Sequence, residues 1–230
     1  MNIRTFKIAK SCRDDSRTAR ACQIVEYAHE SAESLHDAFV HLKGGRKGPA
    51  TDEEQDVLRA MLVFAGAGLD SSIKELFKSC LRHLVLVEPK VKDEFQKFIQ
   101  REISKGTAQL PINTKLLAEA FVEPFPIIYL IERYVYDLTG SSLQSADQIF
   151  SASAALGIDP KKEAKLDKDK LDRIFKARNK IIHEFDIDFS GARRNRVLRP
   201  MTKMIERTNV LLEVSERFIK LVHSKLPDEG

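Results

Sequence analysis

Apolar residues recur every three or four positions along almost the whole chain of 230 residues, which is the period of amphipathic helices. The clearest stripe runs from Ala21 to Leu42 and predicts one long helix over residues 16–43. No stretch has the alternation of a strand pair or an Asn-Gly or Asp-Gly hairpin turn. The chain has only 10 Gly and 8 Pro, which disfavours a turn-rich β sandwich or barrel. We therefore expect an all-α fold, a bundle of about seven or eight helices.

Start and stop signals divide this pattern into separate helices. Thr51 and Glu54 form a capping box, which predicts the start of a second helix. We expect that helix to be interrupted at Gly66 and Gly68, and a further, mostly buried helix to run from Ile73 to Val87. The remaining predicted helices lie near residues 91–105, 114–122, 125–138, 149–156, 167–186 and 200–222.

The domain organisation follows from the lengths of the connections. We expect residues 1–230 to form a single helical domain, with residues 1–15 as a disordered or loosely held tail. Polar connections at 106–113 and 157–165 are possible boundaries, but both are short for a link between two domains. The net charge of +4 permits a nucleic-acid partner without requiring one.

Cysteine usage and hydropathy indicate the compartment. The three cysteines, Cys12, Cys22 and Cys80, form no C-x-x-C pair and fit a reducing environment better than a disulfide scaffold. The first residues lack the apolar core of a secretory signal. No apolar run approaches the roughly 20 residues of a membrane span. We therefore expect a cytoplasmic protein with no membrane partner.

The predicted helix over residues 167–186 has an unusual apolar face. Between Leu171 and Phe185 six apolar side chains cluster on one side, and Arg178 falls close to the middle of that stripe. A guanidinium there must be paired, reach a polar cavity or lie at an interface, because an unpaired buried charge is costly. His183 lies at the edge of the stripe. Asn179 is four residues before His183, so the two side chains can share one side of the helix.

The segment RNKIIH at residues 178–183, inside an apolar helix late in an all-α chain, resembles the Arg-x4-His signature of the HEPN superfamily. The motif covers six residues, and the helical layout fits more loosely across residues 16–222. The resemblance implies a compact helical domain that commonly dimerises. Many members are metal-independent endoribonucleases of bacterial toxin–antitoxin, abortive-infection and CRISPR systems, and some keep the fold without activity.

By the same resemblance, Arg178, Asn179 and His183 match the catalytic positions, RNA is the substrate, and no cofactor or metal is needed. An antitoxin or a defence protein is then a possible partner.

The chemistry of RNA cleavage suits these residue types. The reaction needs a base for the ribose 2′-OH, an acid for the leaving 5′-oxygen and positive charge beside the phosphorane. A histidine can serve as acid or base near neutral pH, and an arginine offers a planar fork of donors to phosphate oxygens. Arg178 and His183 are five residues apart, so they point about 140° apart on a helix. One copy converges poorly on a phosphate, and we expect a composite site at a homodimer interface.

A structural alternative stands beside this interpretation. Arg178 could form an intrachain ion pair with Glu184, Asp186 or another carboxylate. The corresponding rival function is a non-catalytic helical module that binds a protein partner or an RNA. The catalytic hypothesis predicts that Arg178 and His183 from two chains face one solvent-reachable cleft. The non-catalytic hypothesis predicts that Arg178 forms an intrachain ion pair.

A basic run follows the motif helix. We expect Arg193, Arg194, Arg196 and Arg199 to bind the substrate by holding RNA phosphates, with a solvated helix entry as the alternative.

Other chemistries have weaker signals or none. We expect no metal site, because the histidines of the first helix have no ligand partner at a suitable spacing. The sequence has no G-x-S-x-G elbow and no glycine-rich phosphate loop, so nucleotide hydrolysis and dinucleotide chemistry are not expected.

Overall fold

The computed structural model describes residues 2–106, 112–190 and 195–227, and within them the predicted all-α fold is confirmed. These residues contain one isolated antiparallel bridge, between Ile187 and Arg196, and no longer strand. The nine helices of the described residues are α1 (Lys10–Asp14), α2 (Ala19–Lys43), α3 (Asp52–Val87), α4 (Pro89–Ile103), α5 (Thr114–Val122), α6 (Pro126–Thr139), α7 (Ala146–Ala155), α8 (Lys168–Glu184) and α9 (Met201–His223).

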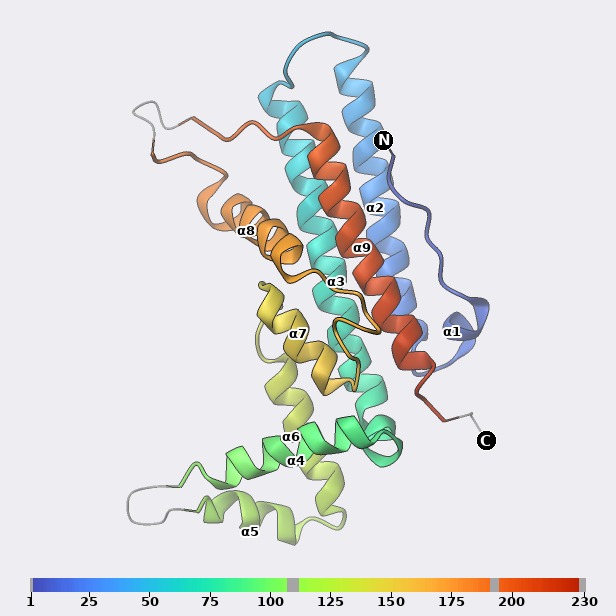
Figure 1. Ribbon diagram of the computed structural model, residues 1–230, viewed down its shortest axis with the longest axis vertical. Coiled ribbons are helices and arrows are strands. Elements are labelled where there is room, and N and C mark those ends of the chain that lie inside the picture. The colour runs from blue at the N-terminus through green and yellow to red at the C-terminus, as the bar shows by residue number, and fades with distance from the viewer. Residues whose placement is uncertain (1, 107–111, 191–194, 228–230) are drawn as a thin grey trace.

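Three long helices, α2, α3 and α9, lie side by side and form the main body of the molecule (Figure 1). The central helix α3 has 36 residues and carries most of the largest fully buried side chains, including Phe77. They pack with Phe39 of α2 and Phe218 of α9 in one core cluster. The capping box of Thr51 and Glu54 forms as predicted and starts α3.

The predicted interruption at Gly66 and Gly68 is wrong, because α3 continues through both glycines to Val87. A Cβ atom at Gly68 would overlap the Cβ atom of Ala28 in α2. Glycine at this position lets two long helices approach closely, so its role is in packing and not in ending a helix.

The N-terminal segment differs from the predicted loose tail. Residues 2–15 run along the body of the molecule, and Ile3, Ile8 and Cys12 are buried in the core. The backbone N–H of Arg4 donates to Asn209 Oδ1 at 2.9 Å. This segment is therefore packed along the helical body through both apolar and polar contacts.

Helices α4, α5, α6 and α7 lie toward one end of the long body (Figure 1). Tyr134 of α6 packs against two rings of α4, with ring centroids 5.7 Å from Phe95 and 4.8 Å from Phe98. This aromatic contact joins α4 and α6.

Helix α8 packs against α3 and α7. Its N-cap is Asp167, whose Oδ1 accepts a hydrogen bond from Lys170 N, and the helix ends at Glu184, two residues before the predicted end. Phe185 and Asp186 both have positive φ angles, of 50° and 61°, so the chain turns sharply out of the helix there.

Candidate functional site

Arg178 lies on the face of α8 that packs against α3. Its side chain is half-buried and passes over Gly66, where an added Cβ atom would lie 3.4 Å from Arg178 Nε. Glycine at position 66 therefore leaves room for the guanidinium stem. Sequence reasoning missed this partner of Arg178, because the same glycine was interpreted as a helix break.

The guanidinium of Arg178 has few partners. Its Nη1 donates to Asn179 Oδ1 at 3.2 Å, and its Nε is buried with no hydrogen-bond partner. It forms no ion pair with any residue that the structure describes. Burial lowers the pKa of Arg178, and the negative charge of Asp70 on α3 acts in the opposite direction. Arg178 is thus a partly desolvated cation without a bound acid.

The two acids that the sequence offered as partners of Arg178 by name, Asp186 and Glu184, do not pair with it. Asp186 is fully buried and pairs with Arg59 of α3 at 3.1 Å and with Arg199 at 2.8 Å. Glu184 is exposed and forms no ion pair within the described residues. The intrachain ion pair that was the structural alternative for Arg178 is absent from the described part of the chain.

Asn179 and His183 line a groove between α8 and the start of α7, about 670 Å³ in volume. Asn179 Nδ2 donates to the backbone oxygen of Gln144 at 3.0 Å, while its Oδ1 accepts from Arg178. Asn179 therefore holds Arg178 on one side and the segment before α7 on the other. His183 is exposed in the last turn of α8.

Two lysines that sequence reasoning did not single out, Lys176 and Lys180, also line this groove. Neither forms an ion pair with a described residue. Their spacing of four places them on the same side of α8, which could have identified them from the sequence. The groove contains two carboxylates as well, those of Asp172 and Glu184.

Arg178 is not among the residues that line the groove. Within one chain the structure therefore brings Asn179 together with each of Arg178 and His183, but it does not bring Arg178 and His183 into one cleft. This separation agrees with the angle of about 140° expected for residues five apart on a helix.

Two of the predicted phosphate-binding arginines, Arg196 and Arg199, are paired with acids in the structure. Arg196 donates to both carboxylate oxygens of Asp56, at 3.1 and 2.5 Å, and Arg199 holds the buried Asp186. These contacts give both guanidinium groups an acidic partner, which offsets the positive charge that they could offer to a phosphate. Arg193 and Arg194 lie outside the described residues.

Several large apolar side chains are exposed around the C-terminal end of α8. Phe185 is 72% exposed. Ile182 and Phe189, within four residues of Phe185 in the sequence, are exposed too, as is Leu198. Large apolar side chains exposed near one helix end are candidates for a protein interface.

Across the described residues, no group of three or more His, Cys, Asp or Glu side chains is arranged to hold a metal ion. None of the helices in the described residues combines the length and the apolar character that crossing a membrane requires.

Comparison of the chain with protein-family models, with curated proteins and with solved structures finds no match.

Proposed function

We propose that the protein is a metal-independent endoribonuclease of the HEPN type, with a composite site made by two copies of the chain. The observation that carries this proposal is Arg178, a half-buried guanidinium with no acidic partner among the described residues. It lies on the same helix as a solvent-exposed histidine, His183. A cation that is neither paired nor fully solvated is suited to binding a phosphate oxygen.

The proposed reaction is an attack of the ribose 2′-oxygen on the adjacent phosphorus. His183 of one copy takes the 2′-OH proton, and protonated His183 of the second copy gives a proton to the leaving 5′-oxygen. The products are a 2′,3′-cyclic phosphate and a 5′-hydroxyl end. Arg178 stabilises the extra negative charge of the phosphorane, and Asn179 fixes the guanidinium through its hydrogen bond.

Two features support the dimer and the RNA substrate. The exposed apolar side chains near the end of α8, among them Phe185, offer apolar surface to the second copy. Lys176 and Lys180 supply positive charge to the groove that contains His183, where phosphates of an RNA strand would lie. We place the enzyme in the cytoplasm, in a stress-response or phage-defence setting with an antitoxin or defence protein as a partner.

The test is cleavage of a single-stranded RNA in the presence of EDTA. The wild-type protein should cut and leave 2′,3′-cyclic phosphate ends, and Arg178→Ala and His183→Ala should each lower the rate by about 10²-fold or more. His41→Ala is the matched control, because His41 is exposed on α2, away from the motif helix. Products with 5′-phosphate ends that require magnesium, or full activity of His183→Ala, would contradict the proposal.

A further inference from the structure

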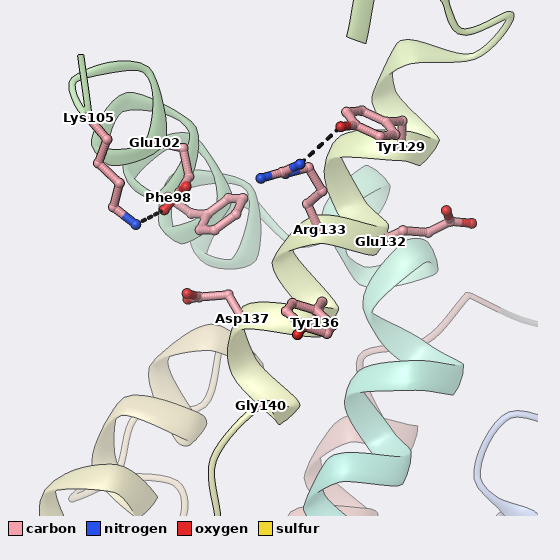
Figure 2. A pocket seen from close by; sticks show the side chains of 9 residues that line it. All are labelled: Phe98, Glu102, Lys105, Tyr129, Glu132, Arg133, Tyr136, Asp137 and Gly140. Carbon is pink, nitrogen blue, oxygen red and sulfur yellow. Dashed lines mark hydrogen bonds and ion pairs between the residues drawn. The ribbon is translucent and has the colours of Figure 1, made fainter. Parts of the chain in front are cut away.

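A second groove lies between α4 and α6, away from the motif helix (Figure 2). Its volume is about 660 Å³. Helix α6 contributes Tyr129, Glu132, Arg133 and Tyr136, whose spacing of three and four places them on one face of the helix. Helix α4 contributes Phe98 and Glu102, and Lys105 follows its end. The groove is therefore formed by the facing surfaces of two helices.

The walls of this groove are fixed by packing on the opposite face of α6. Ile131 and Tyr134 are buried there, and the ring of Tyr134 lies against Phe98 of α4. Burial raises the pKa of Tyr134, so its hydroxyl stays neutral. A surface held by such contacts exists before a ligand arrives, which reduces the cost of ordering it.

Exposed aromatic and apolar side chains continue along α6 and onto the end of α5. Tyr136 is 79% exposed and Phe121 is 78% exposed. Phe125, the N-cap residue of α6, is also exposed. Large aromatic side chains on a surface are characteristic of sites that bind another protein.

The positively charged side chains of the groove, Lys105 and Arg133, both have partners within the protein. Lys105 donates to Glu102 at 2.6 Å, and Arg133 donates to the hydroxyl of Tyr129 at 3.0 Å, as Figure 2 shows. Arg133 also pairs with Glu119 of α5 at 3.3 Å.

Both cations that line the groove are thus engaged, whereas Glu132 has no ion pair with a described residue. Glu132 consequently gives the groove an unpaired negative charge, which disfavours RNA and anionic lipid.

We propose that the α4–α6 groove binds a helical segment of a partner protein that carries apolar anchor residues and at least one arginine or lysine. A helix fits because two packed helices present ridges between which a third can lie. The cation would contact the ring of Tyr136 and the carboxylate of Glu132. The protein already makes contacts of this type, since Arg101 lies over the Phe98 ring at 5.4 Å.

The probes are two short synthetic amphipathic peptides with the same leucines at helical spacing, one with arginines and the other with glutamates on the polar face. Fluorescence anisotropy should show that the arginine peptide binds at least about tenfold more tightly than the glutamate peptide. Tyr136→Ala should weaken binding of the arginine peptide by about tenfold or more. Tyr27→Ala, which removes a tyrosine that is 58% exposed on α2, is the matched control and should leave it unchanged.

Glu132→Gln separates charge recognition from apolar contact, because it should reduce the preference for the arginine peptide while keeping the aromatic surface. Equal binding of the two peptides, or binding that survives Tyr136→Ala, would overturn the proposal. So would adsorption to vesicles of anionic lipid that depends on Tyr136, or a dimer that Tyr136→Asp dissociates, since the occupant would then be a membrane or a second copy. These outcomes do not depend on ribonuclease activity.

Discussion

Replacing Arg178 with methionine should leave the free energy of unfolding unchanged or raise it. The substitution removes the buried Nε that has no hydrogen-bond partner, a relief of about 1–3 kcal/mol for an unsatisfied buried group. It also removes the hydrogen bond to Asn179, which costs about 1 kcal/mol. Methionine keeps most of the apolar stem that passes over Gly66. The net change should therefore lie between zero and about 2 kcal/mol of stabilisation.

The matched comparison is Arg59→Met, which breaks a real buried ion pair. Arg59 and Arg199 together hold the fully buried carboxylate of Asp186. Arg59→Met leaves Arg199 in place but removes hydrogen bonds to charged groups, which are typically worth about 1.5–3 kcal/mol. Urea unfolding followed by far-ultraviolet circular dichroism measures both variants. If Arg178→Met loses as much stability as Arg59→Met, then Arg178 has a structural partner and the reasoning for a phosphate site is refuted.

Three further perturbations test the packing, the assembly and the pH dependence of the protein. Gly68→Ala should destabilise the fold by about 1–3 kcal/mol, because its Cβ atom overlaps α2, and a melting curve that matches wild type would contradict that close approach. Phe185→Asn should convert a dimer to a monomer in light scattering and abolish cleavage without loss of stability, since asparagine tolerates the φ of 50° at this position. Burial raises the pKa of Glu216, but His29 and Arg4 lower it by more, so it lies below the ordinary value of 4.5. The stabilising contribution of Glu216 is therefore complete above pH 4.5 and lost as the pH falls through the lowered pKa, and Glu216→Gln should flatten this acid dependence in urea unfolding.

The sequence predicted the parts of the fold that depend on local interactions. The apolar period of α2, the capping box at Thr51 and the start of α8 near residue 167 depend on residues within one or two helical turns, and all three are found in the structure. The continuity of α3 could not be predicted in this way. Whether Gly68 ends a helix or lets another helix approach depends on Ala28, which is 40 residues away in the sequence.

In the candidate site, too, local spacing predicts some features while others depend on tertiary packing. The position of Arg178 on the buried face of α8 follows from helical spacing alone. The surroundings of Arg196 and Arg199 do not, because their partners, Asp56 and Asp186, are brought to them by tertiary packing and by the turn after α8. A run of basic residues in the sequence thus indicates positive charge. Whether those side chains are paired with carboxylates depends on the fold.

The proposal of a site shared by two copies can be tested by titrating wild-type protein with a double variant, Arg178→Ala with His183→Ala, and following RNA cleavage in EDTA. In a mixed dimer the shared site lacks the side chains of one copy. Cleavage per wild-type chain should therefore fall toward zero as the double variant is added in excess. Cleavage per wild-type chain that stays constant throughout the titration would show that each chain carries a complete site, and would contradict a site built from two copies.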